Sequence, residues 1–132
     1  MAQKLILVLS TIRNEDNFIG IFDEANKNWL VAHEFESAIS EDFFKIWLKN
    51  MAKIKASQIV KIVVDQSEGS FSGARLSTAI ANSFKIAFPQ IKLFSLKAIE
   101  IKVLKKEIGN GRLGLKIKGF IYPKYHRDPS IS

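Results

Sequence analysis

The feature that most constrains the fold is an apolar, β-branched run, followed by a glycine-bracketed turn and then by a helical pattern. The run is Ile59–Val64, and the turn spans Gly69–Gly73. Beyond the turn, large apolar residues recur every four positions, at Leu76, Ile80, Phe84 and Phe88. The run is typical of a buried strand, and the four-residue spacing of a helix. The chain therefore contains a strand–turn–helix unit, around which the other elements can be placed.

The glycine-bracketed turn has two interpretations. A helix N-terminus presents free N–H groups and a partial positive charge, so the turn suits a bound phosphate. The same pattern is also typical of an ordinary capped turn, in which Ser70 or Ser72 accepts a hydrogen bond from the first free N–H groups. Glycines at both ends fit either interpretation, and the turn alone does not decide between them.

Three apolar runs precede the unit and predict three strands. They are Lys4–Leu9, Phe18–Phe22 and Trp29–Phe35, and the breaks between them are short and polar. Short connections favour an antiparallel meander, because parallel strands need a long crossover. The opening of the chain is therefore predicted to form one side of a sheet.

A helix is predicted over Ser40–Lys53, with Ser40 as its cap and two acidic residues in its first turn. Its apolar positions recur at intervals of three and four, at Phe43, Phe44, Trp47, Leu48, Met51 and Ile54. This wide apolar face either covers the sheet or, in part, meets a second protein.

The end of the second helix completes the predicted topology. Pro89 stops that helix, and Ile91–Phe94 predicts a fifth strand, parallel to the fourth through a right-handed crossover. The result is an α/β lobe of order βββαβαβ with a mixed five-stranded sheet over residues 1–100. Residues 101–132 are expected to form a basic C-terminal extension, packed on the lobe or trailing from it. Across the boundary, the residues Leu96, Ile99, Val103, Leu104 and Ile108 favour a helix ended by Gly109, whereas Ile99, Ile101 and Val103 also suit a strand; Leu113–Ile117 predicts a short strand.

The positive charge is concentrated at the C-terminal end. The 132 residues carry a net charge of +7. Residues 1–96 hold eleven Lys and Arg against ten Asp and Glu, whereas residues 97–132 hold nine against three, a net charge of +6. This segment is either a solvated basic surface or a site for RNA or an acidic protein. The RNA interpretation assigns the contacts to Lys116, Lys118, Lys124 and Arg127.

Composition limits the chemistry. The chain has no cysteine, which excludes disulfides and thiol catalysis, and its two histidines, His33 and His126, make a zinc site improbable. We therefore expect no metal and no cofactor. The N-terminal apolar run, Leu5–Leu9, is too short for a signal peptide or a membrane span, so we expect a cytoplasmic protein.

The turn Gly69-Ser70-Phe71-Ser72-Gly73-Ala74-Arg75 resembles the Gly-Ser-Phe-Thr-Gly-Leu-Arg signature of the TsaB family. The resemblance extends from residue 4 to about residue 100, through Ser95-Leu96-Lys97-Ala98. It implies an actin-like, ribonuclease H-like fold and marks Gly69, Ser70, Phe71, Ser72, Gly73 and Arg75 as the motif. TsaB proteins partner TsaD in making threonylcarbamoyladenosine beside the anticodon of tRNA, and they usually carry a second lobe. This chain is similar to one lobe.

Two departures from the family pattern bear on nucleotide binding. Ser10-Thr11 stands where the family's first strand usually ends in Asp-Thr. Asp65 and Glu68 precede the turn where the family tends to have glycines and a proline. Two carboxylates beside the turn would repel a phosphate, by about 1 kcal/mol per close pair in water and more when desolvated.

The resemblance implies a non-catalytic partner protein that docks on a TsaD-like enzyme through its first two helices. The interface residues expected from this are Phe43, Trp47, Met51, Ala74, Thr78 and Ala81. The same surface is expected to join two copies of the chain in isolation. An RNA-binding module that uses the basic C-terminal segment and a small nucleotide-binding enzyme are the alternatives.

Overall fold

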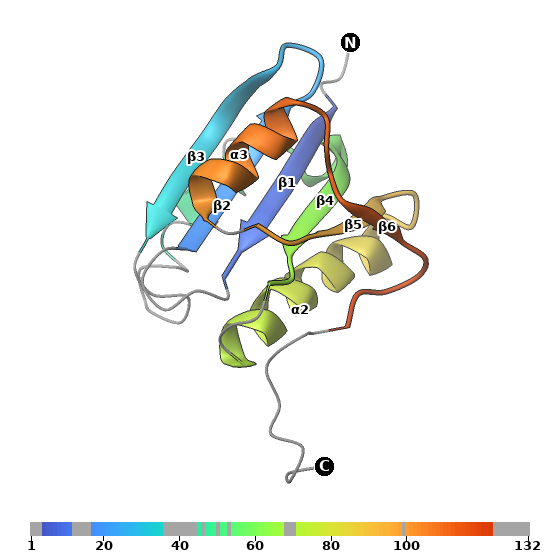
Figure 1. The fold of residues 1–132 in the computed structure, drawn as a ribbon. Coiled ribbons are helices and arrows are strands. Elements are labelled where there is room, and N and C mark those ends of the chain that lie inside the picture. Colours follow the sequence, from blue (N-terminus) through green and yellow to red (C-terminus); the bar gives the residue numbers. More distant parts are fainter. Residues whose placement is uncertain are drawn as a thin grey trace, which may run out of the picture.

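A computed structural model describes residues 4–11, 17–35, 45, 47–49, 51, 52, 54–67, 71–98 and 100–122. These residues form one sheet with helices on both faces (Figure 1). The strands are β1 (Leu5–Ser10), β2 (Asn17–Asp23), β3 (Asn28–Phe35), β4 (Ile59–Asp65), β5 (Lys92–Leu96) and β6 (Leu115–Ile117). The helices are α2 (Phe71–Ala87) and α3 (Ile101–Gly109), and a short 3-10 turn, η1 (Ala56–Gln58), precedes β4.

The sheet has the order β3-β2-β1-β4-β5-β6. The first three strands form the predicted antiparallel meander, and β1, β4 and β5 are parallel to one another. The predicted α/β lobe with a mixed sheet is thus confirmed, and so is the short strand predicted over Leu113–Ile117, but the sheet has six strands rather than five because this short strand joins it. The sixth strand, β6, pairs antiparallel with β5, because the chain returns along the sheet edge after α3.

Burial explains the apolar composition of the central strands. Every residue of β1 and β2 is buried, and so are the last four of β4. A strand covered on both faces needs apolar residues at successive positions, which is the pattern of the Ile59–Val64 run. The edge strand β3 is mostly exposed, because it has one neighbour only.

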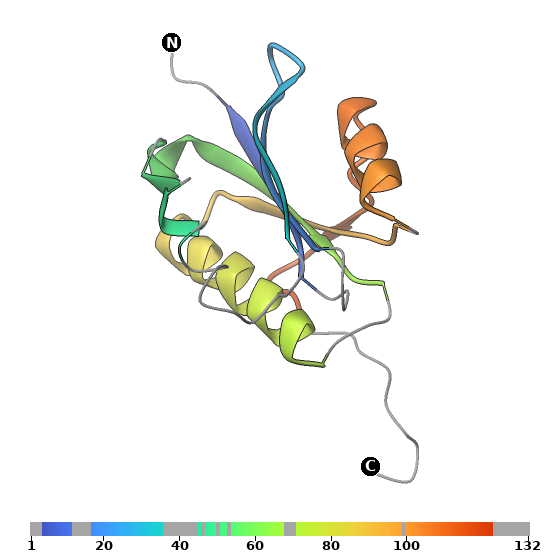
Figure 2. The same cartoon turned by 90° about the vertical axis from the view of Figure 1, so that its left-hand side faces the viewer.

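Each face of the sheet has its own apolar core, and the two main helices lie on opposite faces (Figure 2). On the α2 side, alternate residues of the central strands, such as Leu7 and Ile62, pack with Ala81, Ile80 and Phe84. On the α3 side, the intervening residues of the strands pack against the buried side chains of that helix, which are Ile101, Leu104 and Ile108.

The helix predicted over Ser40–Lys53 lies largely outside the described residues. Of the part that is described, residues 45, 47–49 and 51 are helical. Trp47 and Met51 pack against the core on the α2 side, and the Trp47 ring meets the Phe84 ring edge to face at 6.1 Å. This short stretch therefore lies beside α2 on the same face of the sheet.

The C-terminal segment packs on the lobe and returns to the α2 side. Three glycines with positive φ shape its path, Gly111, Gly114 and Gly119. Gly114 is also a point of close approach, since a Cβ there would lie 2.1 Å from the carbonyl oxygen of Ser95. Beyond β6, Ile121 is 2% exposed within the core under α2. None of the helices in the described part of the chain is long and apolar enough to cross a membrane.

Candidate functional site

A buried polar network lies where β1 and β4 end, at the edge of the sheet that the Gly69–Gly73 turn follows. Its centre is Asp65, which is completely buried. The Ser10 hydroxyl donates to one oxygen of this carboxylate at 2.8 Å. The Ser67 hydroxyl and backbone N–H donate to the other, at 2.7 and 3.0 Å. Ser10, which stands where the family that the turn resembles usually has Asp, therefore acts as a hydrogen-bond donor to Asp65.

This network links three parallel strands at their carboxyl ends. The Ser67 hydroxyl also accepts a hydrogen bond from the backbone N–H of Ala98, beyond β5, at 3.0 Å. Ser95 on β5 donates to the side-chain oxygen of Gln66 at 2.6 Å, and the Gln66 backbone N–H donates to the Leu96 carbonyl at 2.8 Å. Donors from the protein thus occupy both oxygens of the Asp65 carboxylate, and the arrangement is a structural junction.

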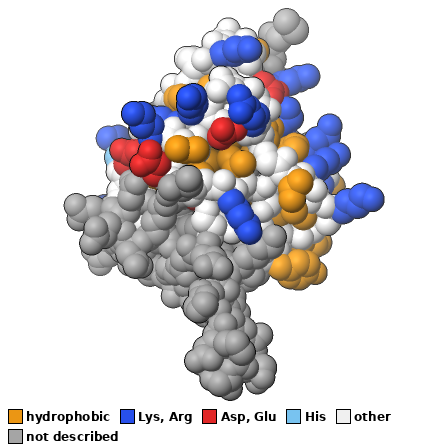
Figure 3. Space-filling view, in the orientation of Figure 1, with side chains coloured by type: hydrophobic (Ala, Val, Ile, Leu, Met, Phe, Trp, Pro, Cys, Tyr) orange, Lys and Arg blue, Asp and Glu red, His pale blue; other side chains and the backbone are white. Residues whose placement is uncertain are grey.

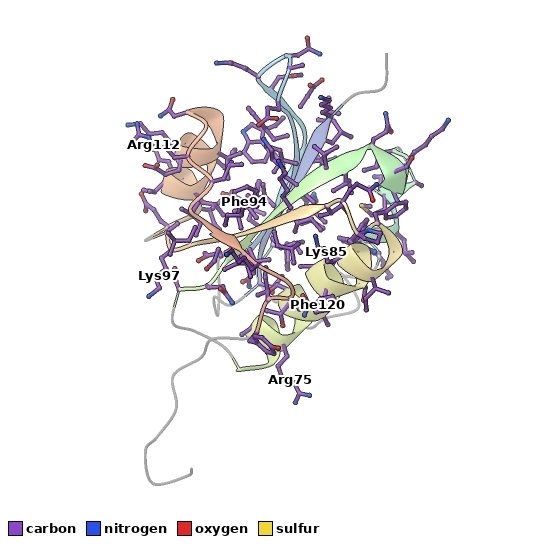
Figure 4. The ribbon with its side chains drawn as sticks, turned by 90° about the vertical axis from the view of Figure 1, so that its right-hand side faces the viewer. Arg75, Lys85, Phe94, Lys97, Arg112 and Phe120 are labelled. Carbon is purple, nitrogen blue, oxygen red and sulfur yellow. The ribbon has the colours of Figure 1, made fainter. Side chains whose placement is uncertain are left out.

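The start of α2 is tied to the same junction. Thr11, at the end of β1, donates its hydroxyl proton to the Gly73 carbonyl at 2.6 Å. Of the motif residues, Gly69 and Ser70 lie outside the described residues, as does Glu68, and α2 begins at Phe71 and Ser72. Arg75 is exposed, and its side chain points away from the sheet (Figure 4). The motif therefore sets where the helix begins.

The residues predicted to contact a partner divide into two groups. Trp47 and Met51 are half-buried beside α2, and Phe43 lies outside the described residues. The small residues Ala74, Thr78 and Ala81 are 3%, 4% and 0% exposed. The prediction that these three residues face a partner is wrong. They lie on the buried side of α2, where small side chains let the helix approach its own sheet closely. The Thr78 hydroxyl donates back to the Ala74 carbonyl at 3.0 Å.

The outer side of α2 is formed by other residues. Arg75, Ala79, Ser83 and Ile86 are exposed and lie three or four positions apart, so they share one side of the helix. Ile86 is 70% exposed. Leu48, which follows Trp47 on the neighbouring helical stretch, is 67% exposed. Each of the two helical segments that cover the α2 face of the sheet thus carries a large exposed apolar side chain.

The predicted RNA contacts are described in part. Lys116 on β6 and Lys118 just beyond it are exposed, whereas Lys124 and Arg127 lie outside the described residues. Among the residues that the structure describes, no group of three or more His, Cys, Asp or Glu is placed to hold a metal ion.

The sequence analysis missed the contacts that hold the C-terminal segment against α2. The Asn82 side chain donates to the Ile121 carbonyl at 2.8 Å and accepts from the Ile121 N–H at 2.9 Å. The Gln66 side chain donates to the Tyr122 carbonyl at 2.7 Å. Asn82 itself was the available signal, since asparagine is unfavourable within a helix and its side chain needs hydrogen-bond partners where it is buried.

With this geometry established, solved structures supply the comparison. YeaZ from Pseudomonas aeruginosa, a TsaB protein, matches with a TM-score of 0.61 and 14% sequence identity, over 82% of this chain and 50% of the YeaZ chain. The fold is TsaB-like. An uncharacterized protein with similarity to peptidase YEAZ from Pseudomonas aeruginosa matches with a TM-score of 0.60 and 15% identity, with the same coverage of both chains.

The TsaB-like fold confirms the architecture that the turn motif implied, a ribonuclease H-like lobe. The chain spans half the length of each of these two structures. No protein-family model matches the sequence, and a search of curated proteins finds no relative.

Proposed function

We propose that this chain is a non-catalytic partner of a TsaD-like enzyme and supports threonylcarbamoyl transfer to tRNA adenosine. The observation that carries the proposal is the exposed outer side of α2, which carries Ile86, together with the helical stretch beside it, which carries Leu48, in a TsaB-like fold. The TsaB resemblance assigns partner docking to the first two helices, and these two segments occupy that place in the chain.

The composition of this surface supports a protein partner. Leu48 is 67% and Ile86 70% exposed, one on each of the two helical segments, and large exposed apolar side chains favour burial by another protein. Ala79 and Ser83 lie on the same side of α2 and are small enough for a partner helix to approach closely. The half-buried rings of Trp47 and Phe84 contact each other edge to face, and this contact joins the helical stretch to α2.

The polar network supports a non-catalytic role. Ser10 and Ser67 direct their hydroxyl groups at Asp65, so neither is presented to a substrate as a nucleophile. The same contacts count against the nucleotide-binding alternative, because the buried carboxylate would repel a phosphate at the turn that follows β4.

Ile86→Glu tests the proposal in a binding assay with the TsaD-like protein of the same organism. We expect the dissociation constant to rise about tenfold or more, since an interface anchor is replaced by a charge that must be desolvated. Stability should change by about 0.5 kcal/mol or less, because the side chain is mostly exposed.

Leu115→Glu is the matched control, because Leu115 is 75% exposed and lies on the edge strand β6 rather than on either of the two helical segments. The control should bind the enzyme as tightly as the unchanged protein. If the unchanged protein does not associate at micromolar concentration, or if both variants behave alike, the docking proposal is wrong.

The same variant tests self-association. We infer that the exposed side of α2 joins two copies of the chain when no enzyme is present, because one apolar surface serves both contacts. Light scattering after size-exclusion chromatography should show a dimer for the unchanged protein and a monomer for Ile86→Glu.

A further inference from the structure

The face of the sheet opposite α2 carries a row of lysines along its β5–β6 edge. Lys116 pairs with Phe94 across the two strands, and paired residues point to the same face. Phe94 packs into the core on the α3 side, so Lys116 lies on that side too. Lys92 lies two positions before Phe94 on β5, so strand alternation places it on the same face, and the exposed Lys118 follows β6 directly.

A second row of cations lies on α3. Its buried residues face the sheet, while Lys102 and Lys106 are exposed and stand one turn apart on the outer side. Lys97 and Arg112, at the two ends of the α3 region, also lie on this side of the molecule, away from α2 (Figure 4). In the space-filling view of this face, basic side chains spread over the region of α3 and toward the β5–β6 edge (Figure 3).

The charge of this face is largely uncompensated. Residues 92–118 contain eight Lys and Arg against two Glu, a net charge of +6. One of the two glutamates is paired within this segment, since a carboxylate oxygen of Glu107 lies 3.6 Å from Nε of Arg112. Among the described residues, no salt bridge joins an acidic group to Lys102, Lys106, Lys116 or Lys118. Within the described residues, this face therefore presents several unpaired ammonium groups, in two rows on the same side of the sheet.

We infer that this lysine face, formed by Lys92, Lys97, Lys102, Lys106, Lys116 and Lys118, binds the phosphate backbone of RNA. The inference rests on the proposed function, in which the RNA is the tRNA that the TsaD-like enzyme modifies. It places the contacts on α3 and β6, within the folded lobe, in addition to the predicted basic tail. Because α2 lies on the other face of the sheet, the chain can hold the enzyme and the RNA at once (Figure 2).

The chemistry of the face favours a polyanion over a protein. Protein interfaces are depleted in lysine and enriched in aromatic residues at their centres. On this face, the aromatic residue Phe94 is packed against the core and lysines form the outer layer. Rows of lysines without an aromatic anchor are suited to phosphates, which need charge and little shape.

The chemistry also favours RNA over a membrane surface. Peripheral membrane binding combines attraction between basic side chains and anionic lipids with the burial of apolar side chains that project among them. The described large apolar residues with the greatest exposure do not belong to α3. Leu115, the nearest in sequence to the lysines, alternates with Lys116 and so points to the opposite face.

The test measures binding of an unmodified tRNA transcript to the full chain across a series of salt concentrations. The variant replaces three cations from both rows: Lys102→Gln, Lys106→Gln and Lys116→Gln. The unchanged protein should show affinity that falls steeply with salt. In the variant, the slope should be shallower by about 2 to 3, and affinity near physiological salt should fall about 100-fold, since each lost phosphate contact removes a slope of about 0.7 to 0.9.

A matched control removes three exposed lysines elsewhere, Lys4→Gln, Lys45→Gln and Lys49→Gln, and so has the same net charge. It should bind tRNA within about threefold of the unchanged protein. Equal losses in the two variants would mean that only net charge matters. Absent or salt-insensitive tRNA binding would also overturn the inference.

Two further measurements distinguish a failure of this inference from a failure of the proposed function. Association with the TsaD-like enzyme should be unchanged in the three-lysine variant. If enzyme binding is lost and tRNA binding is kept, the lysine face contacts protein and the inference is wrong. Phosphatidylserine vesicles should bind the unchanged protein more weakly than tRNA does, and the reverse order would assign the face to a membrane.

Discussion

The helices α2 and α3 cover opposite faces of one sheet, but they are held there by different forces. The nine-residue α3 rests on Ile101, Leu104 and Ile108, which pack into its core. The 17-residue α2 also buries apolar side chains, and in addition hydrogen bonds tie it at two points. Thr11 bonds the Gly73 carbonyl near its start, and Asn82 bonds the Ile121 backbone in its second half.

The difference bears on what each face can do. Hydrogen bonds are directional, whereas apolar burial fixes position less precisely. A helix that docks on a partner must present its side chains at defined positions, and α2 is held in the way that this requires. A surface that binds phosphates through charge tolerates small displacements of its helix, which suits α3 and its lysines.

The largest effect is expected when the apolar support of α3 is removed. Leu104 is completely buried, and Leu104→Ala should destabilise the protein by about 3 kcal/mol through lost burial and the cavity left behind. Urea unfolding measures this loss, and hydrogen exchange locates it. Amides of α3 should lose protection more than those of α2, because hydrogen bonds at two points also hold α2.

Val103→Ala is the control for this substitution, since Val103 lies on the same helix but is only half-buried. The loss in unfolding free energy should be clearly smaller for Val103→Ala than for Leu104→Ala. If protection falls equally in both helices of the Leu104→Ala variant, the two faces open as a single unit and the contrast between them is wrong.

Most of the fold follows from local patterns in the sequence. The apolar runs gave all five predicted strands to within one or two residues, because central strands buried on both faces leave an unbroken apolar signal. The four-residue spacing of Leu76, Ile80 and Phe84 identified α2. The Gly69–Arg75 motif led to the TsaB-like fold, which the solved structures confirm.

What the sequence did not reveal depends on contacts between distant segments. The stretch of β6 reads as a short, isolated strand, and only its pairing with β5 makes it part of the sheet. Ala74, Thr78 and Ala81 fit a helix–helix contact as well as a helix–sheet contact, and spacing alone cannot decide between them. The Asp65 network joins residues 55 positions apart, so its hydrogen bonds leave no local pattern.

Gly114→Ala tests whether β6, and with it the lysine row, depends on close packing against β5. The new Cβ would lie 2.1 Å from the Ser95 carbonyl oxygen, in a residue with φ +87°. We expect a loss of about 2 kcal/mol in stability, combining backbone strain with displacement of β6. Thermal or urea unfolding measures the loss, and binding of tRNA should weaken while binding of the enzyme does not.

Gly111→Ala separates the two causes. Gly111 also has positive φ, at +78°, but a Cβ there meets nothing within 4 Å. This control should cost about 1 kcal/mol from backbone strain alone. Equal effects of the two substitutions would show that contact with Ser95 contributes little to holding β6.

The smallest effect on stability is expected when the hydrogen bonds between Asn82 and the C-terminal segment are removed. Asn82→Ala removes both hydrogen bonds to the Ile121 backbone, and we expect a loss of about 1.5 kcal/mol in unfolding free energy. Hydrogen exchange at the Ile121 amide should accelerate before other sites change, because the substitution frees the C-terminal segment locally.

Two further variants make this prediction specific. Ser83→Ala removes a hydroxyl that bonds only within its own helix, to the Ala79 carbonyl, and should leave exchange at Ile121 unchanged. Asn82→Asp keeps an acceptor for the Ile121 N–H but removes the donor to its carbonyl, so protection of the Ile121 amide should largely persist. If Asn82→Ala also leaves that amide protected, burial of the Ile121 side chain and the hydrogen bond from Gln66 to the Tyr122 carbonyl hold the segment without Asn82, and the proposed role of Asn82 is wrong.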